Sequence, residues 1–230
     1  MEVLSYYSVM TLILALTWIL IFVANNKLRR EIIIISLLAI FLLPVWTVTQ
    51  AGTGQEMQNL FSSLAILDFL FLFSVSGISA TIFHIFFGKH YHNLPKLKKQ
   101  KNKQVISQFW ILRIFITFLT FVWIAIFFSM LLGLSVTYSL LISAIIITVY
   151  VTCHRKDLLA DSIWSALLTA LIVYIASFLG SVFTHTTPVI PFIQTNEFFY
   201  GASVNLLCWA FTLGLVLGPL YEYIRHKKLS

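Results

Sequence analysis

The chain has 230 residues, of which 60% are hydrophobic and 10% charged, and its mean hydropathy is +0.94. Soluble domains are about half apolar and about a quarter charged, so this composition excludes an ordinary soluble domain and indicates a membrane protein. The net charge of +7 comes from short cationic loops between apolar segments, and we expect no nucleic-acid partner.

Seven apolar segments are long enough to cross a hydrocarbon core, which takes roughly 20 helical residues. In chain order they span residues 3–24, 32–50, 60–87, 109–131, 135–152, 158–183 and 200–224. A bilayer offers the backbone no water, and the segments lack the alternation of barrel strands, so we expect α-helices. The sequence therefore predicts an all-α fold, a single transmembrane domain over residues 1–230.

The positions of the cations predict the orientation of this bundle. Lys and Arg follow the first, third, fifth and seventh segments, within residues 27–30, 89–103, 155–156 and 225–228. Alternate loops share one face, which the positive-inside rule makes cytoplasmic. Arg113 begins the fourth helix and can reach that same face. We expect an outside N-terminus, a cytoplasmic C-terminus and a multi-pass protein of the cell membrane, which is the inner membrane in a bacterium.

The third and seventh segments share a pattern. Residues 60–90 and 198–228 align without a gap at an offset of 138. Each begins with aromatic residues, continues with a polar residue (Asp68 or Asn205) and an aromatic run, and ends with a titratable residue (His84 or Glu222). Both helices are expected to run from outside to inside, as a parallel duplication requires.

Two stretches in these helices carry a resemblance. They are Ile-Leu-Asp-Phe-Leu-Phe at 66–71 with Ser-Gly-Ile at 76–78, and Leu-Leu-Cys-Trp-Ala-Phe at 206–211 with Gly-Pro-Leu-Tyr-Glu-Tyr at 218–223. They resemble the paired helices of bacterial membrane proteins with a lycopene cyclase domain. The resemblance covers about a quarter of the chain, together with the helix count and the entry to the sixth helix at residues 155–158.

The chain departs from that family at its acidic motifs, which read Pro-x-Glu-Asp or Pro-x-Glu-Glu once per half. In the second motif Ser203 replaces Pro, and Asn205 and Leu206 replace both acids. In the first motif Ala65 and Leu67 replace Pro and Glu. Asp68 is the only one of the four motif acids that remains.

The resemblance implies a carotenoid or isoprenoid cyclase or isomerase that needs no cofactor. Such an enzyme gives a proton to a carbon–carbon double bond, shields a carbocation and removes a proton again, which suits a carboxyl group in an apolar site. It implies Asp68 and Glu222 as catalytic residues and four substrate-binding residues, Asn205, Phe71, Trp209 and His84. On an ideal helix Asp68 and His84 lie about 24 Å apart, so they cannot share one reacting centre.

Plainer interpretations stand beside these. Asp68 suits a structural hydrogen bond, Asn205 a bond between helices, and Glu222 an interfacial anchor between two tyrosines. Gly214 and Gly218 form a close-packing motif that seats a helix and is a candidate surface for a homo- or hetero-oligomer. The histidines lack the spacing of a zinc site, so we expect no metal. The near absence of charge inside the bundle argues against a polar transport substrate.

Two hypotheses remain open. The first is an active or degenerate enzyme of carotenoid biosynthesis, acting on an isoprenoid ligand within the membrane. The second is a non-catalytic membrane protein that binds membrane lipids or a partner subunit and has lost the cyclase acids.

Overall fold

A computed structural model describes residues 6–42, 66–88, 91–93, 110–184, 198–199, 202–225 and 227–229. Its helices are α1 (Tyr6–Ala24), α2 (Arg29–Leu38), α4 (Ile66–Phe87), α6 (Trp110–Leu132), α7 (Val136–His154), α8 (Leu159–Thr184) and α9 (Val204–Arg225), with short 3-10 helices η1 (Ala39–Leu42) and η4 (Lys156–Leu158). Two minimal antiparallel pairs join β1 (Tyr91–Asn93) to β4 (Lys227–Leu229) and β2 (Phe198–Phe199) to β3 (Ala202–Ser203). The predicted all-α bundle is confirmed.

Six of the helices are long and apolar enough to span a membrane, namely α1, α4, α6, α7, α8 and α9. The second predicted span corresponds to α2 and η1, which end at Leu42, and residues 43–50 lie outside the described residues. The loop 51–59, which is predicted to be outside, most of the lysine-rich loop and residues 185–197 are also not described. The protein is a multi-pass helical membrane protein.

The outer surfaces of the bundle are apolar. Leu16 and Leu20 of α1 are 60% and 70% exposed, and Trp123 of α6 is 63% exposed. Further leucines, isoleucines and phenylalanines of α7 and α8 are exposed in the same way. So much contiguous apolar surface is unfavourable in water and favourable against lipid chains.

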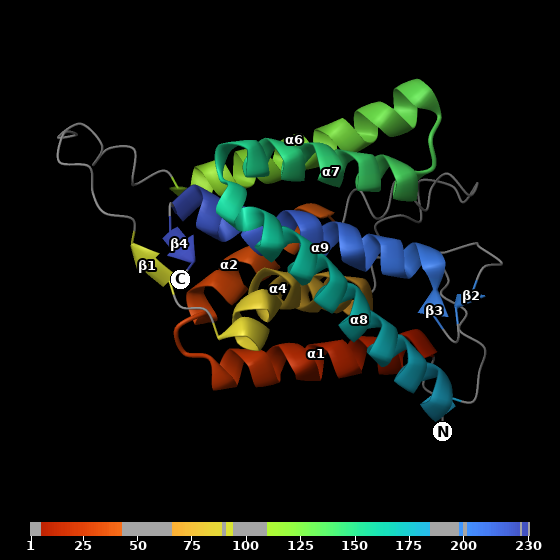
Figure 1. Ribbon diagram of the computed structural model, residues 1–230. Coiled ribbons are helices and arrows are strands. Elements are labelled where there is room, and N and C mark those ends of the chain that lie inside the picture. The colour runs from red at the N-terminus through yellow and green to blue at the C-terminus, as the bar shows by residue number, and fades with distance from the viewer. Residues whose placement is uncertain are drawn as a thin grey trace, which may run out of the picture.

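Helices α4 and α9 form the centre of the bundle, and most of each is buried. They pack against each other and run in the same direction, while α1, α2 and α8 lie around them (Figure 1). The α6–α7 hairpin packs mainly on α9. The two helices that share the offset pattern are therefore the two central helices.

Small residues let α9 approach α8 closely. A Cβ atom added to Gly214 would lie 2.5 Å from Ala166 Cα and 2.6 Å from the Ser165 carbonyl oxygen. One added to Gly218 would lie 2.5 Å from Ser165 Cβ. The predicted helix-packing role of both glycines is confirmed. Helix α8 of the same chain lies against both glycines, and an oligomer that forms through them stays a prediction.

Pro219 lies inside α9 without ending it. Proline has no N–H, so the carbonyl four residues earlier, at Leu215, loses its helical donor. Thr148 of α7 supplies a replacement, because its Oγ1 donates to the Leu215 oxygen at 3.3 Å. A neighbouring helix thus satisfies the acceptor that the proline frees.

The described helix ends that carry cations gather at one end of the bundle. These ends are the end of α1, the starts of α2, α6 and α8, and the ends of α7 and α9 (Figure 1). Arg29 caps the end of α1, with Nε donating to the Phe22 oxygen at 2.9 Å and Nη2 to the Val23 oxygen at 3.2 Å. Helix carbonyls at a C-terminus lack helical donors, so the arginine satisfies them.

Candidate functional site

Four titratable side chains from four helices meet inside the bundle, near the cation-bearing end. Glu31 comes from α2, His84 from α4, Asp161 from α8 and Glu222 from α9. Their exposed fractions are 2%, 4%, 1% and 0%. We call these four residues the inner cluster. Ionisable groups at such burial in a membrane protein are costly and are commonly found at functional sites.

Direct contacts hold the inner cluster together. His84 Nε2 and Glu222 Oε1 are hydrogen-bonded to each other, and they form an ion pair when the imidazole is protonated. One ligand atom from each of Glu31, His84 and Glu222 lies within 4.8 Å of the other two. Asp161 interacts electrostatically with all three, and its Oδ1 accepts a hydrogen bond from Ser165 Oγ at 3.2 Å. The cluster thus combines three carboxyl groups and one imidazole in an apolar setting.

The cation-bearing end of the bundle adjoins this cluster through Arg155. Its Nη1 donates to the Glu222 backbone oxygen at 2.9 Å, and its Nη2 pairs with Asp157 Oδ2 at 2.5 Å. The guanidinium therefore connects the last turn of α9 to η4, the 3-10 turn that precedes α8. It bonds to the backbone of Glu222 and to the carboxylate of Asp157.

A row of aromatic rings lies between the inner cluster and the lipid-facing surface of the bundle. The Phe83 ring lies 5.8 Å from the His84 ring, and Phe87 lies 4.8 Å from Phe83. Trp164 of α8 lies 5.4 Å from Phe87, and both of these outer rings are nearly half exposed. Between α4 and α8 the cluster is thus separated from the lipid-facing surface by aromatic side chains.

A second polar site, the outer pair, lies at the start of α4. Tyr7 of α1 donates its hydroxyl to Asp68 Oδ1 at 2.6 Å. Both side chains are buried, and the ring of Phe71 lies 6.0 Å from that of Tyr7. Asp68 is in the first turn of α4, where the helix dipole favours a carboxylate. The adjacent Tyr6 is hydrogen-bonded to Ser177 of α8, so α1 bridges α4 and α8 at this level.

The structure divides the predicted site residues between these two centres. It brings His84 and Glu222 together, and it places Asp68 sixteen residues away along the unbroken helix α4. Phe71 lies beside the outer pair. Asn205 is half-buried in the first turn of α9 and Trp209 is buried one turn later. The expectation that Asp68 and His84 lie too far apart to share a reacting centre holds.

Sequence reasoning missed Glu31 and did not assign a role to Asp161. Both lie within about one turn of cations at a helix start, where a carboxylate has an ordinary dipole explanation. One feature of the sequence does indicate that Glu31 and Asp161 lie near His84 and Glu222. Each of the four cluster residues lies one to five positions from a cation-bearing segment, so all four share one depth in the bundle.

Two expectations need correction. Glu222 is fully buried against His84, so it is not an interfacial anchor. The bundle interior does contain several titratable groups, so the argument against polar transport from an uncharged interior fails. The expectation of no metal stays a prediction: it rested on local histidine spacing, and ligand atoms of Glu31, His84 and Glu222 from three helices lie within 4.8 Å of one another.

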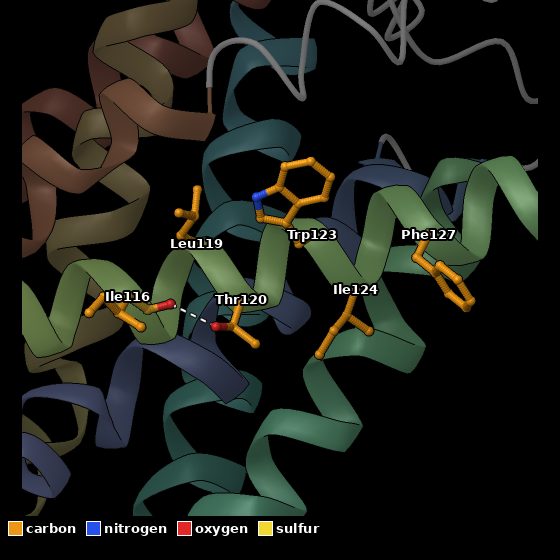
Figure 2. A pocket seen from close by; sticks show the side chains of 6 residues that line it. All are labelled: Ile116, Leu119, Thr120, Trp123, Ile124 and Phe127. Atoms are coloured by element: carbon orange, nitrogen blue, oxygen red, sulfur yellow. Dashed lines mark hydrogen bonds between the residues drawn. The ribbon is translucent and has the colours of Figure 1, made fainter.

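A shallow groove of about 430 Å³ lies on α6 and is unrelated to either polar centre. Figure 2 shows the six residues that line it along this helix: Ile116, Leu119, Thr120, Trp123, Ile124 and Phe127. The Thr120 hydroxyl donates to the Ile116 oxygen of its own helix at 2.8 Å. The groove is an apolar surface suited to a lipid chain, and its lining includes no titratable group for acid–base chemistry.

Comparison of the chain with protein-family models, with curated proteins and with solved structures finds no match. The protein is a multi-pass membrane bundle with two buried polar centres at opposite ends of its central helix α4.

Proposed function

We propose that the protein binds an isoprenoid such as a carotenoid within the cell membrane and carries out acid–base chemistry on it, with Asp68 as the acid. The observation that carries the proposal is the buried hydrogen bond between Tyr7 and Asp68. Asp68 is also the only motif acid left by the resemblance to lycopene cyclase-domain proteins. Membrane lipids surround the bundle and supply the route by which an apolar substrate arrives.

The proposed reaction is an isomerisation that conserves atoms. Asp68 gives its proton to a terminal carbon–carbon double bond, and the resulting carbocation is attacked by a second double bond, which forms a ring. A carboxylate then removes a proton from a carbon next to the new cation, so a double bond forms again. One proton is added and one is removed, and no oxidant or reductant is needed.

Tyr7 has a defined part in this scheme. Its hydroxyl donates to Asp68 Oδ1 at 2.6 Å, and such a hydrogen bond strengthens as the carboxyl group acquires negative charge. The position of Asp68 in the first turn of α4 favours the same charged form. Tyr7 and the helix dipole thus stabilise the group that remains after proton transfer.

Aromatic residues at the same level are suited to a polyene. Phe71 lies beside Tyr7, and the face of an aromatic ring stabilises a nearby cation. Asn205 and Trp209 begin α9, which packs against α4 and runs in the same direction, so they are placed at a corresponding level. We assign them to the other side of the same binding region, and we assign His84 and Glu222 to a separate centre.

The test is expression in cells that accumulate lycopene, followed by pigment analysis. Wild-type protein is expected to yield ring-bearing products. Asp68→Asn keeps the shape of the side chain and removes its acidic proton, so it is expected to lower the amount of ring-bearing product by at least roughly 100-fold. Tyr7→Phe is expected to lower it by a smaller factor. Asp157→Asn, an acid at the opposite end of the bundle, serves as the matched control and is expected to match wild type.

Two outcomes contradict the proposal, provided that immunoblots show equal protein in the membrane. One is an unchanged pigment profile with wild-type protein. The other is equal product from wild type and Asp68→Asn. An unchanged profile together with a co-purifying lipid supports the non-catalytic alternative instead.

A further inference from the structure

The inner cluster has no part in the proposed isoprenoid chemistry, yet it is the most deeply buried group of titratable residues that the structure describes. Glu31, Asp161 and Glu222 contribute three carboxyl groups against one imidazole, that of His84. An apolar bundle disfavours uncompensated charge strongly. Three carboxyl groups around one imidazole form a setting that favours a positively charged species.

We propose that Glu31, His84 and Glu222 bind one divalent transition-metal ion. Ligand atoms from all three lie within 4.8 Å of one another and come from α2, α4 and α9. Two ligands at about 2.1 Å from an ion lie at most about 4.2 Å apart, so side-chain shifts of less than about 1 Å close the site. Inward-facing residues on neighbouring helices form metal sites in other helical bundles in the same way.

Asp161 provides an independent observation that points to a ligand. Its side chain is 1% exposed, and among the described residues its Oδ2 atom has no hydrogen-bond partner, whereas Oδ1 is bonded to Ser165. It interacts electrostatically with each of the three ligand residues. A buried carboxylate oxygen of this kind is suited to bind the ion or to accept a hydrogen bond from a water molecule on it.

Charge balance favours a divalent ion. The two ionised ligands, Glu31 and Glu222, carry −2 and a metal-bound imidazole is neutral, so an ion of charge +2 balances the three ligands. An ionised Asp161 then leaves the cluster with a charge of −1, whereas a monovalent ion would leave it with −2. The mixed carboxylate and imidazole ligand set suits Mn²⁺, Fe²⁺ or Zn²⁺ better than an ion that prefers oxygen alone.

The experiment measures metal bound to the purified full-length chain in detergent, with an affinity tag that contains no histidine. The protein is stripped with a chelator, incubated with Mn²⁺ or Zn²⁺, desalted and analysed by mass spectrometry for metal per chain. Wild type is expected to retain one ion and to show a higher melting temperature with the metal. Glu31→Gln, His84→Gln and Glu222→Gln are each expected to weaken binding by more than roughly 100-fold.

Asp68→Asn is the matched control, because it removes a buried acid from the same helix as His84 but from the other centre. It is expected to retain one ion per chain. Folded wild-type protein that retains no ion and shows no shift in melting temperature overturns the proposal, whether or not the variants fold. Equal binding by wild type and the three cluster variants places the ion elsewhere and also overturns it. Metal binding is measured without substrate, so its failure is separate from failure of the isoprenoid chemistry.

Discussion

Removing one partner of the His84–Glu222 pair should lower the free energy of unfolding far more than removing one partner of the Arg155–Asp157 pair. The first pair is buried on both sides, whereas Arg155 and Asp157 are 12% and 37% exposed at the side chain. Removing one partner of a buried pair costs about 3–5 kcal/mol because it leaves an uncompensated charge. Exposed pairs contribute about 0.2–1 kcal/mol.

Double-mutant cycles test this difference. His84→Ala should lower the free energy of unfolding more than Glu222→Ala does. The first variant removes the imidazole from among three carboxyl groups, whereas the second leaves the imidazole beside two carboxyl groups. The double variant should lower the free energy of unfolding by about as much as the more destabilising single variant. The coupling energy between the two residues is then roughly 3 kcal/mol. The cycle on Arg155 and Asp157 should give less than about 1 kcal/mol.

The assay is SDS-driven unfolding in mixed micelles with a chelator present, followed by circular dichroism. The chelator keeps bound metal from adding to the measured stability of wild type. A coupling energy for His84 and Glu222 no larger than that of the exposed pair would refute the buried inner cluster.

Two further predictions concern helix packing. Gly214→Ala and Gly218→Ala should each destabilise the fold by about 3 kcal/mol in the same unfolding assay, because the added Cβ meets backbone atoms of Ala166 and Ser165 at position 214 and the Ser165 Cβ, which no rotamer change moves, at position 218; unchanged stability in either variant would contradict the α8–α9 packing. Thr148→Val should lower the free energy of unfolding by about 1 kcal/mol, because the Leu215 carbonyl loses the hydroxyl donor that replaces the missing proline N–H. Pro219→Ala restores that N–H, so Thr148→Val should have a smaller effect in a Pro219→Ala background.

Hydrophobic segments and glycine spacing were enough to predict the bundle. The membrane spans follow from length and composition, since a helix is the way for an isolated segment to satisfy its backbone in lipid. The contact of Gly214 with α8 follows from the need for small residues where helices approach closely. Of the second predicted span, 32–50, the structure describes residues 32–42, and these are helical in α2 and η1.

The inner cluster was harder to predict because its members lie far apart in the chain. The offset of 138 did align His84 with Glu222, and those two residues are in direct contact. Glu31 follows Arg29 and Arg30 and has an ordinary explanation at a helix start, so nothing local marks it as a member. Which helices become neighbours depends on packing, and that is not encoded in any one segment.

The most direct test of the proposed acid–base function uses the same lycopene-accumulating cells in heavy water. The carboxyl proton of Asp68 exchanges with solvent, so protonation of the terminal double bond should leave one deuterium in the product for each ring formed. Mass spectrometry of the purified pigment is expected to show this increment with wild-type protein and no ring-bearing product with Asp68→Asn. Rings that carry no solvent deuterium, or equal labelled product from both proteins, would contradict proton delivery by Asp68.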